Sequence, residues 1–205
     1  MPGLLGLWSF ETRGDSSIGD SSGFGHPAQF RGDGNAELRT GRNGDAIYLR
    51  GDSDIAVPST DQLRPQSMTL SAWVNIEPGF RDFGWLIGEG DNFGLVVNRF
   101  TPGDVHFYYR SRGHWVSHTT SNIPVNDQEW HHVAATFDND SLISKIYIDG
   151  ELINTEQHYD PIAYEVGEGV HLGSMLGTRN YEGLLDEVSI FDRPLEPTAI
   201  LELMD

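Results

Sequence analysis

Hydrophobic and polar residues alternate along several short stretches of this chain. In MTLSAWVNI, at positions 68–76, the even-numbered residues are all apolar, whereas the odd-numbered ones include Thr69, Ser71 and Asn75. A period of two is that of a β-strand, in which neighbouring side chains point to opposite faces. The pattern predicts a half-buried strand with one face in the core.

Turn residues then join such stretches into hairpins. GLVVNRF and VHFYYRSR flank a PGD turn, and KIYIDGELI contains Asp149-Gly150 as a two-residue turn, so both pairs are expected to be antiparallel. Only EPTAILELM at the C-terminus has a helical pattern, and no internal repeat or low-complexity linker separates the strands. We therefore expect an all-β fold in a single domain, 1–205: a two-sheet antiparallel β-sandwich (jelly roll) with a short C-terminal helical turn.

The amino-acid composition agrees with this fold and disfavours some classes of binding partner. The 205 residues include 24 glycines, 10 prolines and 11% aromatic residues, which favour short strands joined by turns. The 31 acidic and 13 basic residues give a formal charge of −18, which disfavours nucleic acid and anionic membrane surfaces as partners. Cysteine is absent, which excludes disulfides and thiolate chemistry. No apolar run approaches the roughly 20 residues of a membrane span, so no membrane insertion is expected.

The opening MPGLLGLW lacks the basic start and the length of a signal peptide. We therefore expect the chain to be one domain of a larger parent protein.

Two adjacent histidines, His131 and His132, raise the question of a metal or catalytic site. They lie in an apolar stretch with strand character, EWHHVAATFD, so their side chains point to opposite faces and cannot ligate one ion together. We interpret both as structural residues of a strand.

Four motifs in order carry a resemblance to a known family. They are LWSFET with GDSSGFGHPAQF near the N-terminus, MTLSAWVNI, EWHHVAATFDNDSLISKIYIDGELI, and HLGSMLGTRNYEGLLDEVSIFDRPLEPTAI. In these motifs the chain resembles the laminin-G-like domains of the concanavalin A-like superfamily, which are common in bacterial extracellular proteins. The resemblance implies a jelly roll of two curved sheets at an extracellular or cell-surface location. It also implies bound calcium in many members, and a role in binding glycans or proteins.

The stretch GLLDEVSIFD allows a physical check of the calcium implied. Leu184, Asp186, Val188 and Ile190 alternate with the other residues, so if their face is the core one, a carboxylate points into it. A buried unpaired charge is costly, and an arginine or a cation could neutralise it. The resemblance implies the second: a calcium ion held between the N-terminal loop and the last strand.

The predicted calcium ligands are the carboxylates of Asp20 and Asp186, carbonyls near Gly23 and His26, and Glu11 as a weaker candidate. Phe24 replaces the asparagine of the family's common SGNG pattern and removes one oxygen ligand. In the alternative interpretation Asp20 only caps a turn and Glu187 is an ordinary surface charge.

Catalysis is considered because glycoside hydrolases share the superfamily. Retaining hydrolysis needs two carboxyl groups about 5 Å apart, which a spacing of two on a strand can give. Three pairs have that spacing, Asp52/Asp54, Glu89/Asp91 and Asp138/Asp140, but they lie in apparent loops. The ExDxxE pattern of laminarinase-like hydrolases is absent. We therefore expect no enzyme, with glycan degradation as the alternative.

Three clusters have the aromatic and planar polar side chains typical of a sugar site. We predict that a glycan or polysaccharide contacts Trp85, Asn92, His106, Tyr108, Arg110, Trp115, Arg179, Asn180 and Tyr181. For Tyr108 and Trp85 the alternative is a place in the core. The predicted function is a non-catalytic, calcium-stabilised, lectin-like module. The alternative is an adhesion domain with a protein ligand, or a structural spacer domain.

Overall fold

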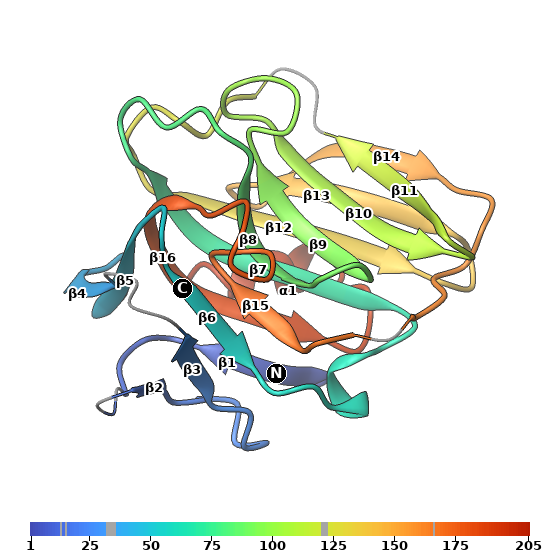
Figure 1. The fold of residues 1–205 in the computed structure, drawn as a ribbon. Helices are drawn as coiled ribbons and strands as arrows, with labels where there is room; N and C mark the ends of the chain where they lie inside the picture. The colour runs from blue at the N-terminus through green and yellow to red at the C-terminus, as the bar shows by residue number, and fades with distance from the viewer. Residues whose placement is uncertain (13, 15, 32–35, 120–122, 166) are drawn as a thin grey trace.

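The computed structural model describes residues 1–205 except 13, 15, 32–35, 120–122 and 166. In that part of the chain the strands form two antiparallel sheets, which pack face to face (Figure 1). The predicted all-β sandwich is confirmed. No helix among the described residues is long and apolar enough to cross a bilayer.

Sheet A contains eight strands. Its order is β14 (Glu151–Gln157), β13 (Ile143–Ile148), β12 (His131–Asp138), β7 (Met68–Ile76), β16 (Glu182–Phe191), β5 (Asp45–Arg50) and β4 (Glu37–Thr40), and β1 (Leu4–Trp8) also pairs with β16.

Sheet B also contains eight strands. Its order is β11 (His114–Thr119), β10 (Val105–Ser111), β9 (Phe93–Val97), β8 (Gly84–Glu89), β15 (Val170–Leu172), β6 (Asp54–Val57), β3 (Ala28–Arg31) and β2 (Ser17–Ile18). A 3-10 turn, η1 (Asp61–Leu63), precedes β7, and the helix α1 (Pro197–Glu202) follows β16. One large cluster of buried apolar side chains fills the space between the sheets.

Both predicted hairpins are present. β9 and β10 pair from Val97 opposite Val105, and β13 and β14 pair from Ile148 opposite Glu151. The turn residues Asp149 and Gly150 both have positive φ, 51° and 77°, as a type I′ hairpin turn requires. The predicted C-terminal helical turn is α1, whose Ile200 is fully buried.

The prediction for β7 needs correction, because both of its faces are buried. The odd-numbered residues Thr69, Ser71 and Trp73 have exposed fractions of 0, 1 and 5%. The segment that follows β16 covers Thr69, whose hydroxyl donates to the Arg193 carbonyl at 2.7 Å and accepts from the backbone N–H of Leu195 at 2.9 Å. The Ser71 hydroxyl bonds to that of Ser189 at 2.9 Å, and Trp73 packs against His132. Polar residues in this strand therefore mark hydrogen-bonded burial and not solvent.

β16 departs from the alternation expected for it. A bulge shifts its register against β7: Asp186 lies opposite Trp73, but Ser189 lies opposite Ser71. Glu187, with a φ of 47°, is the extra residue. The four residues expected on one face therefore divide, because Val188 joins the core between the sheets whereas Asp186 lies opposite Trp73 on the outer face.

The twin histidines have separate structural partners, as predicted. His131 contacts the carboxylates of Asp127 and Asp149 at 2.9 and 2.8 Å through its two ring nitrogens. His132 is 1% exposed and packs edge-on against Trp73, with ring centroids 5.4 Å apart. Burial lowers the pKa of His132 to about 4, although the charge of Asp149 acts to raise it.

Candidate functional site

A cleft lined by aromatic and arginine side chains lies on the outer face of sheet B. Its volume is about 120 Å³. Four predicted ligand-binding residues line it: His106, Tyr108, Trp115 and Arg179. Five further residues complete the lining: Phe83, Arg99, Phe100, Ser117 and Met175. We call this feature the aromatic cleft.

Strand alternation places the central side chains of the aromatic cleft. In β10, Phe107 and Tyr109 belong to the core between the sheets, so His106 and Tyr108 point to the opposite face. Antiparallel pairing with β11 sets Tyr108 opposite Ser117 and Arg110 opposite Trp115. The cleft therefore has its base on two paired strands.

The aromatic rings pack at steep angles and leave part of their surface open. Tyr108 meets Trp115 edge-on, with ring centroids 4.8 Å apart, and Phe100 meets His106 at 5.2 Å. Trp115 and Phe100 are 44% and 68% exposed. Below them, Trp85 contacts Tyr108 at 5.6 Å and is fully buried. The rings of Trp115 and Phe100 thus present apolar surface to solvent above buried aromatic side chains.

Three guanidinium groups lie over the rings of this region. Arg99 and Arg179 lie 4.9 and 4.6 Å from the centroid of the Phe83 ring, and Arg110 lies 5.3 Å from that of Trp115. Burial raises the pKa of the Tyr108 hydroxyl, while the positive charges of Arg179 and Arg99 oppose that rise. The Tyr108 phenol is therefore neutral and keeps its proton as a hydrogen-bond donor.

Two of the nine predicted residues lie next to the aromatic cleft. Arg110 forms ion pairs with Asp91 at 3.6 Å and Glu165 at 3.4 Å. Asn180 lines a neighbouring hollow that shares Phe83 and Arg179 with the cleft, and its amide donates to the Gly51 carbonyl at 2.7 Å.

Three predicted residues need correction, because Trp85, Asn92 and Tyr181 have no exposed surface. The Asn92 amide accepts from the backbone N–H of Glu165 at 2.7 Å and donates to Glu89 at 3.1 Å. The Tyr181 hydroxyl donates to the Leu184 carbonyl at 3.2 Å, within the core. These three side chains support the fold and do not reach a ligand.

The sequence prediction missed the arginine and phenylalanine at the end of GLVVNRF. Arg99 and Phe100 follow β9, and their backbone N–H groups donate to the Asp104 carboxylate at 2.7 and 2.9 Å. This turn holds both residues beside His106. The signal was present, because the predicted hairpin brings the residues after β9 next to the start of β10.

The carboxylate pairs considered for catalysis have structural partners. Glu89 is 1% exposed and pairs with Arg64 at 2.7 Å. The Asp54 carboxylate accepts from the Ser174 hydroxyl and contacts His171 Nδ1, both at 2.7 Å. Asp138 accepts from the Ser141 hydroxyl at 2.6 Å. Each of the three pairs thus has at least one carboxylate engaged by a structural partner.

Among the predicted calcium ligands, Asp20 binds backbone N–H groups. Its carboxylate accepts from Leu7 at 3.1 Å, from Ser22 at 2.9 Å and from His26 at 2.9 Å. Burial acts to raise the pKa of Asp20, but hydrogen bonds from Ser22, His26 and Leu7 hold it below its usual range. The His26 carbonyl accepts the Trp8 indole N–H at 2.9 Å. These contacts match the turn-capping alternative for Asp20.

The remaining loop residue, Gly23, has a φ of 88°, in the left-handed region that glycine adopts readily. This is the backbone freedom on which the calcium prediction relied for that loop.

Asp186 and Glu11 instead meet around the loop 41–45. Asp186 accepts from the backbone N–H groups of Asn43 at 2.9 Å and Glu187 at 2.8 Å, and Glu11 accepts from that of Asp45 at 2.6 Å. Burial raises the pKa of Asp186 to about 6, backbone hydrogen bonds oppose the rise, and the charge of Glu11 adds to it. The hydrogen bonds of Asp20 and Asp186 thus involve different segments.

Among the described residues, the carboxylates of Asp20 and Asp186 accept hydrogen bonds from different backbone N–H groups. The described residues also hold no group of three or more histidine, cysteine, aspartate or glutamate side chains arranged to bind a metal ion.

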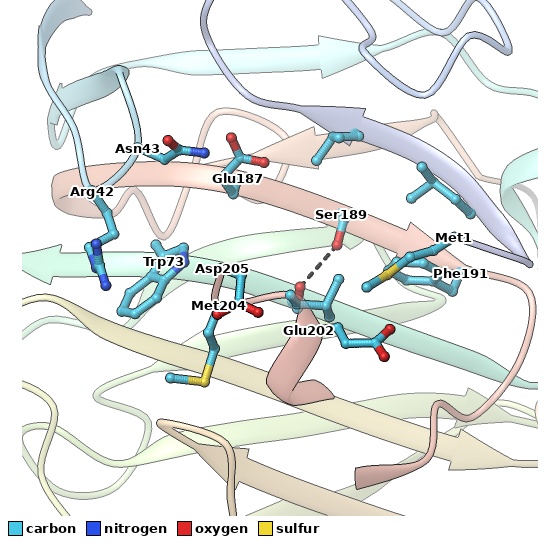
Figure 2. Close-up of a pocket in the computed structure, with 14 residues that line it drawn as sticks. Met1, Arg42, Asn43, Trp73, Glu187, Ser189, Phe191, Glu202, Met204 and Asp205 are labelled. Atoms are coloured by element: carbon cyan, nitrogen blue, oxygen red, sulfur yellow. Dashed lines mark hydrogen bonds between the residues drawn. The ribbon is translucent and has the colours of Figure 1, made fainter. Parts of the chain in front are cut away.

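A larger cavity, of about 260 Å³, lies on the outer face of sheet A between β1, β7, β16 and α1. Figure 2 shows Trp73 and Arg42 at one side of it and Met1 with Phe191 at the other. The hydroxyls of Ser189 and Ser71 hydrogen-bond at 2.9 Å across its floor. Glu187, Glu202 and Asp205 add acidic groups to its wall. This cavity contains one tryptophan and no aromatic cluster, so the aromatic cleft remains the better candidate for a sugar site.

Comparisons with known proteins agree on the fold. A family model described as the concanavalin A-like lectin/glucanases superfamily (Laminin_G_3) matches residues 49–201. A search of curated proteins finds no match. Among solved structures, domain 4 of AbnA, an extracellular arabinanase from Geobacillus stearothermophilus solved with arabinotriose, is similar, with a TM-score of 0.74 and 23% identity over 98% of both chains.

Two toxin structures are similar over part of their length. The binding domain of botulinum neurotoxin serotype D/C has a TM-score of 0.77 and 14% identity, and that of Paraclostridial Mosquitocidal Protein 1 has 0.74 and 17%. Each match covers 98% of this chain but only 51 and 52% of the toxin chain. The chain therefore spans about half the length of these toxin domains.

Proposed function

Because the chain belongs to the concanavalin A-like lectin/glucanase superfamily, we propose that it is a non-catalytic module that binds a glycan in the aromatic cleft. The observation that carries this proposal is the cleft itself, which joins exposed Trp115 and Phe100 to the guanidinium groups of Arg99 and Arg179.

The physical argument is that a sugar ring has two kinds of surface. Its apolar C–H face stacks on aromatic rings, and its hydroxyl edge needs planar, directional hydrogen-bond donors and acceptors. Trp115 offers the first kind of contact, and Arg179 with the neutral Tyr108 phenol offers the second. The base of the cleft is buried and paired in sheet B, so little ordering is needed on binding.

The similar structures support a binding role. Domain 4 of the arabinanase was solved in complex with arabinotriose, and it matches this chain over 98% of both lengths. Binding domains of botulinum neurotoxin DC were solved with a SialylT glycan and with synaptotagmin II, a protein. Fold likeness alone does not transfer a ligand, so the cleft chemistry supports the glycan over the protein partner.

We further propose that this module belongs to a secreted or cell-surface protein, with other domains beside it. The extracellular arabinanase and the toxin binding domains support that location. Calcium stabilisation stays part of the proposal, restricted to the loop 41–45, where a cation would reduce the repulsion between Glu11 and Asp186.

A glycan array, followed by calorimetry on the sugars that bind, tests the function. Binding that Trp115→Ala weakens supports a lectin-like module. Silence on all glycans, with a normal melting transition, would favour the adhesion or spacer alternative. Release of products from a bound polysaccharide would indicate an enzyme.

A further inference from the structure

Two arginines of the aromatic cleft have no carboxylate partner among the described residues. In the described part of the chain, ion pairs with acidic side chains involve Arg39, Arg50, Arg64, Arg110 and Arg193. Arg99 and Arg179 form none there, although acidic residues outnumber basic ones by 31 to 13. The two unpaired guanidinium groups therefore lie together in one small cleft of an acidic protein.

Both guanidinium groups lie against the ring of Phe83 and not against a carboxylate. Their central carbons lie 4.9 and 4.6 Å from its centroid. A cation–π contact uses the face of the guanidinium plane or its charge, and it satisfies none of the five N–H donors as a hydrogen bond would. These donors have the fork geometry that matches a carboxylate or a sulfate.

Two positive charges act at the base of the cleft. Burial raises the pKa of the Tyr108 hydroxyl, the charges of Arg179 and Arg99 act to lower it, and the charge of Asp91 acts to raise it. Asp82 shares the neighbouring hollow with Arg179, yet no ion pair links them in the described structure. An anionic group on the ligand would neutralise both arginines.

The overall charge of −18 limits how many anionic groups such a ligand carries. At physiological ionic strength the screening length is about 8 Å, so the cleft arginines dominate at contact and the remaining surface repels the rest of a dense polyanion. A glycan with an isolated acidic unit satisfies both conditions.

We propose that the aromatic cleft selects a sugar unit carrying one anionic group, a carboxylate or a sulfate ester, which Arg99 and Arg179 bind while its ring stacks on Trp115. This inference rests on the proposed glycan-binding function and names its ligand class.

Matched ligands that differ only in the acidic group test the proposal by calorimetry. Lactose is compared with 3′-sialyllactose and 3′-sulfolactose, and xylotriose is compared with the same trisaccharide carrying one glucuronic acid. We expect at least one acidic member to bind about tenfold or more tightly than its neutral partner, because charge-assisted hydrogen bonds are the strong ones. The preference should shrink as salt rises, and the two acidic lactose derivatives distinguish carboxylate from sulfate.

Variants locate the preference. Arg99→Gln and Arg179→Gln should each lower the ratio of acidic to neutral affinity about tenfold, and Arg99→Lys, which keeps the charge but loses the fork, should lower it less. Arg193→Gln removes the same charge from the exposed Arg193–Asp192 pair and should leave the ratio unchanged. Thermal melts establish whether each variant is folded. If a glutamine variant does not fold, Arg99→Lys still tests the proposal.

Neutral sugars that bind as tightly as their acidic partners, with affinity still lost in Trp115→Ala, would overturn this inference and leave the glycan-binding function intact. An acidic preference that survives in both arginine variants would also overturn it. No binding by any member of either set, or by any sugar on the array, would overturn the inference together with the proposed function.

Discussion

The rings of Tyr108 and Trp115 stand edge-on to one another, with centroids 4.8 Å apart and planes at 87°. Tyr108 is 7% exposed, whereas Trp115 is 44% exposed. The Tyr108 ring is therefore part of the packing, whereas the adjoining Trp115 ring is open to a ligand.

This difference predicts separable effects of the two alanine variants. Trp115→Ala should weaken glycan binding by about 2 kcal/mol, roughly thirtyfold, with little change in melting temperature. Tyr108→Ala should weaken binding and also lower stability by about 3 kcal/mol, because it leaves a cavity over Trp85. Calorimetry and thermal melts measure both. Tyr159→Ala, an aromatic deletion at a 90% exposed position, is the control and should change neither. If Trp115→Ala binds like the parent, the ligand site lies elsewhere.

The twin histidines should respond to pH in opposite ways. Burial acts to lower the pKa of His131, but hydrogen bonds donated to Asp149 and Asp127 raise it above its usual value. The contribution of His131 to stability is therefore present below about pH 6.5 and disappears as pH rises through the folded-state pKa. The pKa of His132 is lowered to about 4, so its contribution is present above about pH 6.5 and is lost as pH falls toward 4.

His131→Gln should therefore lower the melting temperature more at pH 5.5 than at pH 8, and His132→Gln more at pH 8 than at pH 5. Neither should change glycan affinity, because both lie on β12 of sheet A. Melts over this pH range and a binding isotherm are the measurements, and lost affinity at an unchanged melting temperature would show that the pair has a binding role.

Calcium should raise the melting temperature through the loop 41–45. At 100-fold saturation a one-site ligand adds about 2.7 kcal/mol, which corresponds to roughly 5–10 °C for a domain of this size. Metal-free protein is melted with calcium and with EDTA. Asp186→Asn should abolish the difference, whereas Asp20→Asn, which weakens a carboxylate cap on backbone N–H groups, should lower both melts and keep it. Identical melts of the parent protein would contradict the proposal.

Breaking the buried Glu89–Arg64 ion pair should lower the free energy of unfolding strongly. Glu89 is buried and accepts hydrogen bonds from Arg64 Nε and Nη2 at 2.7–3.0 Å. Glu89→Gln leaves the partly buried guanidinium unpaired and should destabilise the fold by about 3 kcal/mol in a denaturant titration. The exposed Glu37, which pairs with Arg39 and Arg50, provides the control, because Glu37→Gln should leave the denaturation midpoint nearly unchanged. Equal effects of the two variants would refute this assignment.

Local sequence chemistry was sufficient to predict the hairpins and four of the nine residues that line the aromatic cleft. The Asp149-Gly150 turn needs only residues that tolerate positive φ, and the outward direction of His106 and Tyr108 follows from alternation within one strand.

Features that depend on distant residues were not predictable from the sequence. Asn92 is buried because its amide bonds to Glu165, 73 residues away, and Thr69 is buried because Arg193 and Leu195 cross over it. Nothing in the local alternation distinguishes such residues from solvent-exposed ones.

The bulge in β16 also determines how this strand can tolerate a change in length. It lies where the outer neighbour of β16 changes from β5, which ends its pairing at Leu185, to β1, which begins at Val188. Leu185 and Val188 both face the core although their positions differ by three, whereas residues on one face of a regular strand differ by an even number of positions. Deleting Glu187 alone would therefore restore a regular strand, with Val188 opposite Ala72 and both Val188 and Ile190 still facing the core. The bulge thus absorbs one residue without exchanging the faces of β16, so the strand should tolerate the loss of that residue, whereas a single deletion in a regular part of the strand would exchange its two faces.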